Sequence, residues 1–428
     1  MDERRDDDAN PPERKLSFWR RLGPGLITGA SDDDPSGIGT YSQVGAQFGF
    51  SMLWTMLFSY PLMSAVQIVA ARIGRTTGRG IAGNMRPHYP RALLYAIVTL
   101  LLLANVINLG ADIGAMGAAV QMLVGGPQLL HVVGIAVASI GLQVFVPYHR
   151  YVGYLKWLTL SLFAYVVTAV VVRVPWAEAL RSTVIPSLQF SSVYFTAFIA
   201  VLGTTISPYL FFWQASEEVE EVGAHDAEEP LKQQPRQAPA QFARIRFDTI
   251  SGMGFSNIVA WTIILTTAAT LHAHGQLEIQ TAEQAAKALE PLAGRLAFAL
   301  FAVGIVGTGL LAIPVLAGSA AYGVGEAMGW PTGLERAPRK AKRFYGVIAI
   351  ATAVGAAQNF LHVSPMKALF WTAVINGVVA VPVLVVMMLI AGNKKVMGEF
   401  TVGPGLKILG WLTTFVMFAA AIGMFATL

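Results

Sequence analysis

Three consecutive aspartates at residues 32–34 lie inside an otherwise apolar segment, and Pro35, Ser36 and Gly37 follow them. A proline removes one backbone hydrogen-bond donor and clashes with the carbonyl one helical turn back, so a helix that contains this sequence is expected to break there. Carboxylate oxygens are ligands for hard cations such as Mg²⁺. Asp34, which immediately precedes Pro35, is therefore our first candidate for a cation ligand.

A second apolar segment contains a similar interruption. Residues 203–208 read Gly-Thr-Thr-Ile-Ser-Pro, which places Thr204, Ser207 and Pro208 in the middle of a hydrophobic stretch. Where a helix unwinds away from water, its freed backbone carbonyls need a partner, and a bound cation with its waters is one such partner.

The composition indicates the surroundings of these two segments. Of the 428 residues, 54% are hydrophobic and only 13% are charged, about half the charged fraction of a typical soluble domain. A helix needs roughly 20 apolar residues to cross the hydrocarbon core of a bilayer. The hydropathy of the chain predicts an all-α polytopic membrane protein with eleven spans, near residues 23–46, 50–71, 93–123, 129–147, 153–174, 193–215, 250–272, 295–325, 344–361, 367–391 and 407–427.

The basic residues alternate between the connections. With the N-terminus inside, the inner segments hold 25 of the 30 Lys and Arg residues, and the outer segments hold Arg173, Arg181, Lys287, Arg295 and Lys367. Basic residues concentrate on the cytoplasmic side of membrane proteins. We therefore expect a protein of the plasma membrane, or inner membrane, with a cytoplasmic N-terminus and Leu428 outside.

The remaining segments suggest a single transport domain. Residues 1–21 are charged and are expected to form a disordered cytosolic tail, while 22–428 form the transmembrane domain. Residues 216–249, rich in Glu, Gln and Pro, are expected to be a mobile cytosolic linker. The chain has no cysteine, and it contains no nucleotide-binding loop, nucleophile elbow or zinc-protease helix. We therefore predict no enzyme activity, no cofactor and no nucleic-acid partner; the expected partners are the bilayer and a transported solute.

The two breaks occupy equivalent positions if spans 1–5 and 6–10 are repeats, because they fall in the first and sixth spans. Paired broken helices mark the midplane site of inverted-repeat transporters. We therefore predict two inverted five-helix repeats followed by an eleventh helix. A carboxylate within a membrane costs roughly 2.5–3.5 kcal/mol on insertion scales, so Asp34 is expected to have a function.

The segment GPGLITGASDDDPSGIGTYSQVGAQFGF resembles the first helix of the Nramp family of divalent metal transporters, which passes through a DPGN motif and ends near QFGY. The YHRYVGYLKW loop, the spacing of the spans and the broken sixth span extend the likeness over most of the chain. The resemblance implies a LeuT-type fold and transport of divalent transition metals, usually together with protons.

The departures from the family pattern concern the residues expected to bind metal and protons. Gly37 stands where DPGN has its asparagine, and Ser207 and Tyr209 stand where the sixth helix has the methionine and histidine of A-x-x-M-P-H. Gln214 replaces a second histidine. In the third span, Asp112 falls on the glutamate of a D-x-x-E pair whose first acid is lost.

These changes imply a harder substrate ion. Loss of the methionine thioether removes a ligand that favours transition metals, and glycine in place of asparagine is expected to open space. Mg²⁺ is usually held through one or two carboxylates while it keeps several waters. The pattern resembles the Nramp-related magnesium transporters. We expect the metal site to include Asp34, Gly37, the carbonyl of Ser31, the hydroxyls of Thr204 and Ser207 and, in the tenth span, Asn376.

The same residues leave alternatives open. Loss of titratable groups at 209 and 214 predicts transport of Mg²⁺, and also of Mn²⁺, without coupled protons. A proton-coupled Mn²⁺ or Fe²⁺ importer with altered ligands is the first alternative. A carrier of organic solutes with the same fold is the second, although three acids at a helix break disfavour an anionic substrate. The run Glu217 to Glu221 is expected to be a solvated face.

Overall fold

The computed structural model describes residues 28–29, 31–146, 159–224, 228–361 and 363–427. The predicted tail at 1–21, the start of the first span and the whole YHRYVGYLKW loop lie outside the described residues. The α-helices are α2 (Pro35–Phe48), α3 (Trp54–Thr77), α4 (Ile81–His88), α5 (Arg91–Val124), α6 (Gln128–Phe145), α8 (Phe163–Val171), α9 (Trp176–Val184), α10 (Ser192–Thr205), α11 (Pro208–Ala224), α12 (Ala238–Thr270), α13 (Ala282–Ala286), α14 (Glu290–Ala293), α15 (Ala297–Met328), α16 (Lys342–Ala357), α17 (Pro365–Gly392), α18 (Lys394–Met397) and α19 (Pro404–Thr427).

The helices correspond to the eleven predicted spans. Within the part of the chain that the structure describes, nine helical segments are long and apolar enough to cross a membrane, and α10 and α11 together form one of them. The first span is represented by α2 and the fifth by α8, and both predicted spans also include residues outside the described ones. No β-strand occurs among the described residues.

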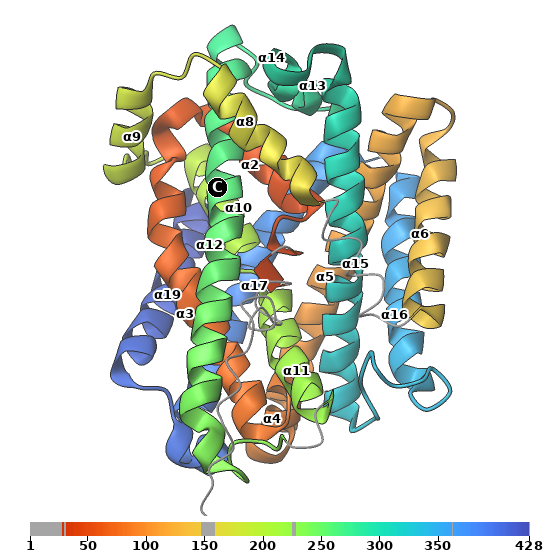
Figure 1. Ribbon diagram of the computed structural model, residues 1–428, viewed down its shortest axis with the longest axis vertical. Coiled ribbons are helices and arrows are strands. Elements are labelled where there is room, and N and C mark those ends of the chain that lie inside the picture. The colour runs from red at the N-terminus through yellow and green to blue at the C-terminus, as the bar shows by residue number, and fades with distance from the viewer. Residues whose placement is uncertain (1–27, 30, 147–158, 225–227, 362, 428) are drawn as a thin grey trace, which may run out of the picture.

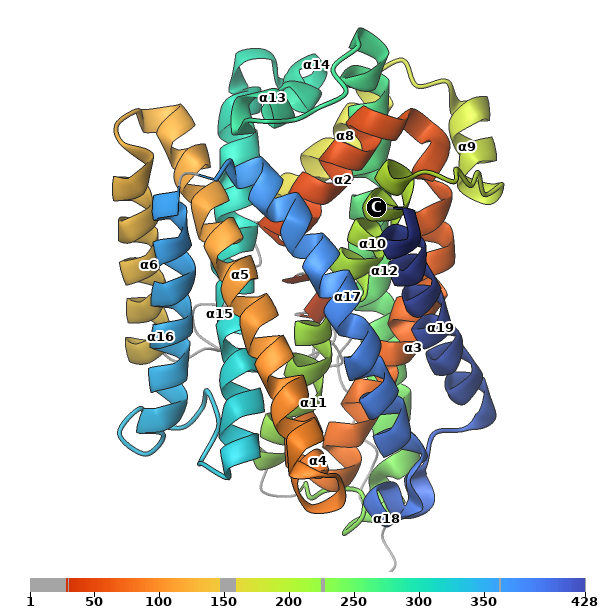
Figure 2. The ribbon, with the colours of Figure 1, turned by 180° about the vertical axis from the view of Figure 1, so that it is seen from behind.

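The two broken spans lie at the centre of the bundle. Helix α2 packs against α10, α12 and α17, and α5 packs against α15 and α17. Figures 1 and 2 show α12 on one side of this centre and α17 and α5 on the other, with α6 and α16 together on one flank and α19 beside α3 on the opposite flank. The long helices around α2 therefore separate its polar residues from lipid.

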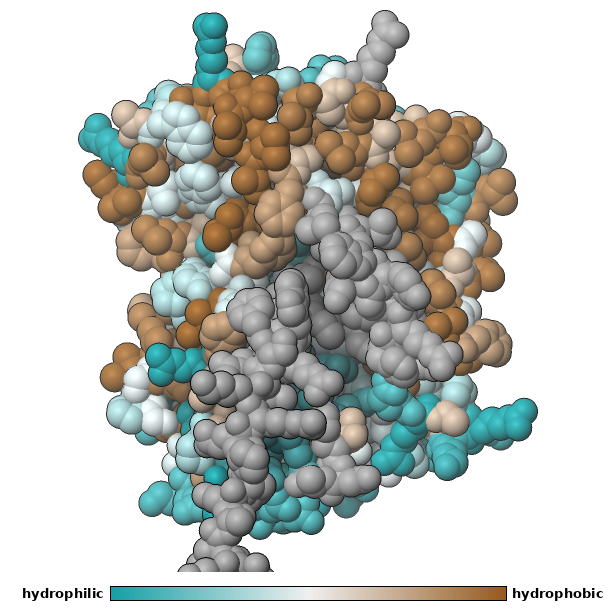
Figure 3. Space-filling view, in the orientation of Figure 1, coloured by the Kyte–Doolittle hydropathy of each residue, from teal (hydrophilic) through white to brown (hydrophobic). Residues whose placement is uncertain are grey.

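The surface has the character expected of a membrane protein. Large apolar side chains are exposed on the outer helices, including Leu103, Val137, Phe145 and Phe415. Figure 3 shows apolar side chains over the upper part of the molecule and hydrophilic ones at its lower end, where α4 and the start of α12 lie. Helix α18, with Lys394 and Lys395, lies at this same end (Figure 2). Several basic segments predicted to be internal thus gather at one end.

The predicted linker at 216–249 is shorter than expected. Helix α11 continues to Ala224 and α12 begins at Ala238, so helices occupy both ends of the predicted range. Between them, the amides of Leu231 and Lys232 donate to the carbonyls of Arg75 and Thr76, each at 3.2 Å. Helices therefore replace much of the predicted linker, and these two hydrogen bonds join part of the described connection to the end of α3.

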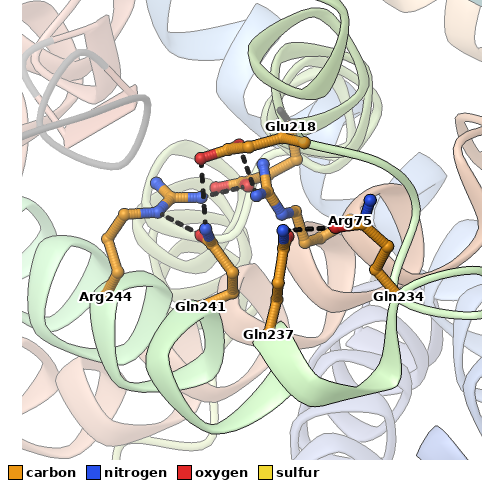
Figure 4. A network of polar contacts seen from close by, with 7 residues as sticks. Arg75, Glu218, Gln234, Gln237, Gln241 and Arg244 are labelled. Carbon is orange, nitrogen blue, oxygen red and sulfur yellow. Dashed lines mark hydrogen bonds and ion pairs between the residues drawn. The ribbon is translucent and has the colours of Figure 1, made fainter. Parts of the chain in front are cut away.

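Buried ion pairs explain why the helices extend so far. Glu218 of α11 is fully buried and pairs with Arg244 of α12 at 2.5 Å, while Arg75 of α3 pairs with Glu228 at 2.5 Å (Figure 4). Glu220 of α11 accepts a hydrogen bond from the hydroxyl of Tyr322. The expectation of a solvated acidic face was therefore wrong for Glu218, whose charge is compensated by Arg244 inside the protein, while Glu220 is half-buried and hydrogen-bonded.

Candidate functional site

The first break occurs at Asp34, as predicted. Residues 31–32 are helical, Asp34 has an extended backbone (φ −68°, ψ 171°), and α2 begins at Pro35. The Asp34 side chain caps the new helix: its Oδ1 accepts hydrogen bonds from the Gly37 amide and the Ser36 hydroxyl, both at 2.7 Å. A side-chain cap followed by proline at the first helical position is a strong helix start, so this sequence sets the position of Asp34.

The second break occurs at Ser207, also as predicted. Helix α10 ends at Thr205, Ile206 leaves the helical conformation (φ −123°, ψ 56°), and α11 begins at Pro208. The Ser207 hydroxyl donates to the carbonyl of Gly203 at 2.7 Å and is 2.9 Å from that of Thr204. Its single proton therefore satisfies a carbonyl that the break would otherwise leave free.

Two further helices reach Asp34. Its second oxygen, Oδ2, accepts hydrogen bonds from the Asn108 amide of α5 at 3.1 Å and from the Tyr209 hydroxyl of α11 at 3.2 Å. The Tyr209 hydroxyl is also 3.4 Å from the carbonyl oxygen of Ser31. Asp34, Asn108 and Tyr209 are each at most 1% exposed. The backbone carbonyl of Ser31 and the carboxylate of Asp34, both predicted site groups, thus contact the same hydroxyl, that of Tyr209.

Asn108 extends the polar network to α17. Its amide nitrogen also donates to Asp112 Oδ2 at 3.0 Å, and its oxygen accepts from the Asn376 amide at 3.1 Å. Asn108 therefore lies between Asn376 and Asp34 and is hydrogen-bonded to both of them. Asp112 Oδ1 and Asn376 Oδ1 are buried and have no hydrogen-bond partner among the described residues. Oxygen atoms in this state are available to a cation or to water.

The space beside Gly37 is narrow. A Cβ atom at this position would lie 3.1 Å from the Asp32 carbonyl oxygen and 3.1 Å from Thr204 Oγ1. Gly37 and Thr204, both predicted site residues, are thus neighbours across the two breaks. A larger side chain at this position would therefore meet the start of the first break and the end of α10, and the expectation that glycine opens the site stays a prediction.

Asp32 and Asp33 contact α12, whereas Asp34 contacts α5 and α11. The Ser256 hydroxyl lies 2.7 Å from Asp32 Oδ2 and 3.1 Å from Asp33 Oδ1. Both aspartates are at most 1% exposed, so they do not line a water-filled approach in this conformation. One hydroxyl has one proton to donate, and it therefore cannot serve both carboxylates at once.

Two site residues carried no predicted role. Asn108 was not among the predicted site residues, and Tyr209 was named only as a replacement for histidine. A signal for Asn108 existed in the sequence, since it lies four residues before Asp112 and so on the same face of a helix. Tyr209 offered no comparable signal, because its hydroxyl reaches Asp34 only through the packing of α11 against the first span.

The donor atoms gathered here are oxygens from a carboxylate, amides, hydroxyls and backbone carbonyls. Among the described residues, no three His, Cys, Asp or Glu side chains form a group that could hold a metal ion. Oxygen donors of this kind are the ligands that hard cations prefer.

Comparison with known proteins supports the resemblance noted above. Residues 25–427 match the family described as Natural resistance-associated macrophage protein-like, or Nramp. A protein of Yersinia pestis (strain Pestoides F) named divalent metal cation transporter MntH is 26% identical over 421 residues, covering 96% of this chain and 95% of its own. A protein of the same name from Klebsiella pneumoniae (strain 342) is 25% identical over 401 residues, covering 91% and 90%.

Solved structures show the same fold. A point mutant of the Eremococcus coleocola manganese transporter has a TM-score of 0.74 at 17% identity, covering 95% of this chain and 87% of its own. MhsT in complex with L-phenylalanine has a TM-score of 0.63 at 12% identity, covering 94% and 98%. The predicted LeuT-type inverted repeat with broken first and sixth helices is thereby confirmed. With its family match over nearly the whole length, the chain belongs to the Nramp family, whose members are metal transporters and not enzymes.

Proposed function

We propose that this protein carries divalent metal cations across the membrane, with Asp34 as the charged ligand at the ion's binding site. The observation that carries the proposal is the position of this buried carboxylate. It lies at the break before α2, where one of its oxygens faces groups from α5 and α11. The names of the MntH relatives agree with this substrate class.

The preferred ion is proposed to be Mg²⁺, with Mn²⁺ also transported. The side chains hydrogen-bonded to Asp34 are those of Ser36, Asn108 and Tyr209, and none of them is a thioether or an imidazole. Ser207 supplies a hydroxyl where the related transporters of the resemblance have methionine. Without a soft ligand, the site does not favour transition metals over hard cations.

A largely hydrated ion needs more room than this conformation offers, because Thr204 lies against Gly37. We therefore propose that α10 and the start of α2 separate when the ion enters. Helix breaks that face each other across a repeat interface permit such a movement, since rocking of one repeat against the other opens the site to each side in turn.

Transport is proposed to proceed without protons, driven by the ion gradient and the membrane voltage, which contributes about 4.6 kcal/mol per 100 mV for a divalent cation. Asn108 lies between the carboxylates of Asp34 and Asp112 and donates to both. An amide does not titrate in water's pH range, so it offers no step for a proton between them.

Asp112 supports the alternative function, a proton-coupled Mn²⁺ or Fe²⁺ importer. It is fully buried, it stands where the family has an acid, and one of its oxygens has no partner among the described residues. It could therefore exchange a proton without Asn108. The Mn²⁺ transport named for the Eremococcus coleocola protein agrees with this alternative as well.

The proposed orientation places the N-terminus in the cytoplasm and the C-terminus outside, in the plasma or inner membrane. Its support is the alternation of basic residues and the position of α4 and α18 at one end of the molecule (Figure 2). Labelling of single cysteines introduced at Gly333 and Gly275, on opposite sides in this topology, with a membrane-impermeant reagent would test it.

The test of the transport proposal uses the purified protein in liposomes that contain a pH-sensitive dye. We expect uptake of Mg²⁺ and Mn²⁺ without acidification of the lumen. Metal-dependent acidification that is absent from empty liposomes would favour the proton-coupled importer. Calorimetric titration with alanine serves as the control for an organic substrate, and heat from alanine without heat from either metal would contradict the proposal.

A further inference from the structure

A groove on the outside of the bundle combines an apolar wall with two arginines. It has an empty volume of about 1280 Å³ and lies between α3, α12 and α19. Its wall includes Pro61, Ile68, Phe242, Ile250 and Leu409. Helix α3 packs against both α12 and α19, and both ribbon views place α19 against α3 on the flank away from α6 (Figures 1 and 2).

The groove faces the lipid and has the length of a lipid chain. Phe247, Ile250 and Ile408, on or beside its rim, are 45%, 37% and 67% exposed. Along α3 it extends from Tyr60 to Arg72, twelve residues or roughly 18 Å at 1.5 Å per residue. One leaflet of a bilayer has a hydrocarbon thickness of about 15 Å, so an acyl chain and its glycerol fit this length.

The two arginines lie at one end of the groove, near the ends of their helices. Arg72 is five residues before the end of α3 at Thr77, and Arg246 is eight residues after the start of α12 at Ala238. At the helical rise these positions are about 8 and 12 Å inside the helix ends. That end is the hydrophilic end of the molecule (Figure 3). The arginines are therefore at the depth where lipid phosphates meet the hydrocarbon.

Neither arginine has a charged partner among the residues that the structure describes. The Arg72 guanidinium lies 3.8 Å from the centre of the Phe242 ring, and its Nε is buried without a hydrogen-bond partner. Arg75 and Arg244, close by on the same two helices, are each paired with a glutamate at 2.5 Å (Figure 4). The protein compensates the charges that point inward and leaves those at the groove uncompensated.

We propose that this groove is a binding site for an anionic phospholipid. The phosphate binds to Arg72 and Arg246, and one acyl chain lies along α3, α12 and α19. Guanidinium groups hold phosphate through charge-assisted hydrogen bonds, and basic pockets between membrane helices suit anionic headgroups. Such a lipid would hold α19, the helix outside the two repeats, against the start of α12.

The test measures thermal unfolding of the delipidated protein in detergent, with added phosphatidylglycerol, phosphatidylcholine or inorganic phosphate. We expect phosphatidylglycerol to raise Tm and the other two to have little effect. The variant R72Q/R246Q should lose this increase, with lipid affinity roughly 30-fold weaker for the loss of two charges. The matched control is Arg91→Gln, an exposed arginine at the same end of the molecule, which should retain the full increase.

Three results would overturn the proposal. They are an equal increase with phosphatidylcholine, an equal increase with inorganic phosphate alone, and an undiminished response of R72Q/R246Q. If the double variant does not fold, Arg246→Gln alone takes its place, because this side chain is exposed. Native mass spectrometry then supplies a second readout: the wild type should retain bound phosphatidylglycerol at activation energies where Arg246→Gln has lost it.

Discussion

The break in the first span and the break in the sixth span differ in where their polar side chains point. At the first break, Asp34 uses one oxygen to cap its own helix and presents the other to α5 and α11. At the second break, Ser207 directs its hydroxyl to carbonyls of its own helix. The first break therefore supplies charge to the centre of the bundle, while the second supplies flexibility and a small side chain.

This difference suggests a division of roles within one site. Asp34 supplies a carboxylate that faces both α5 and α11, whereas Ser207 can be replaced without loss of charge. Loss of the first group should abolish transport, and changes of the second should alter which ion is preferred. Four substitutions test the comparison, in order of expected effect.

The largest effect is expected from Asp34→Ala, which removes the charge and the helix cap together. Uptake of Mg²⁺ and Mn²⁺ into liposomes should fall by roughly a hundredfold or more. Loss of a residue that only supports a metal ligand typically lowers metal affinity or activity by about 10- to 100-fold, so loss of the ligand itself should cost more. Glu178→Ala, in the exposed helix α9, is the control and should transport normally. Normal uptake by Asp34→Ala together with loss of uptake in Asp33→Ala would show that the ligand is Asp33 instead.

Ser207→Met combined with Gly37→Asn should change selectivity. A thioether and an amide that bind the ion directly favour a cation that loses its bound water easily, and Mg²⁺ loses its water reluctantly. The preference for Mn²⁺ over Mg²⁺ should therefore rise about tenfold, equivalent to about 1.4 kcal/mol. Competition uptake with both ions measures the ratio. Because a Cβ at Gly37 would be 3.1 Å from two oxygens, the single variant Ser207→Met is tested alongside.

Ser207→Ala is the control for that experiment. Its ratio should stay near that of the wild type, since the lost hydroxyl bonds only to its own helix. A ratio shifted as far by alanine as by methionine would show that the hydroxyl itself contacts the ion, and the contrast between the two breaks would fail. A wild type that ignores Mg²⁺ but carries Mn²⁺ well would refute the hard-ion argument.

Tyr209→Phe should have a smaller effect. It removes one hydrogen bond to Asp34 Oδ2 and the contact with the Ser31 carbonyl. A hydrogen bond of this kind contributes about 1 kcal/mol, so the apparent affinity for Mg²⁺ should change about fivefold while the maximal rate is largely kept. Tyr60→Phe, whose hydroxyl bonds to the Ile250 carbonyl, is the control. An unchanged affinity for Mg²⁺ in Tyr209→Phe would show that the Tyr209 hydroxyl of α11 does not contribute to the ion site.

The sequence was sufficient for the parts of this site that follow from local chemistry. Asp34 before Pro35 and Ser207 before Pro208 predicted both breaks, because proline disrupts helices wherever it occurs in their interior. Contacts between distant segments were not predictable in the same way. The approach of Thr204 to Gly37, and of Tyr209 to Asp34, depends on how α10 and α11 pack against the first span.

The linker illustrates the same limit. Its composition predicted a mobile segment, yet Glu218 and Arg244 form a buried pair between α11 and α12. Composition records that both residues are charged, but it does not record that they face each other across two helices. Local pattern therefore located the candidate ligand, and only the packing of helices identified its neighbours.

The smallest effect is expected from Ser256→Ala, which tests whether the other two aspartates of the first break belong to the ion site. Ser256 contacts Asp32 and Asp33 but not Asp34. Loss of this hydroxyl should disturb the electric field near the ion without removing a ligand. Uptake of Mg²⁺ should therefore slow by about threefold, which corresponds to the free energy of about one hydrogen bond, and the preference between Mn²⁺ and Mg²⁺ should stay unchanged. Ser59→Ala, a buried serine bonded within α3, is the control. A loss as complete as that of Asp34→Ala would place Asp32 or Asp33 on the ion, and the first break would then supply more than one charged ligand.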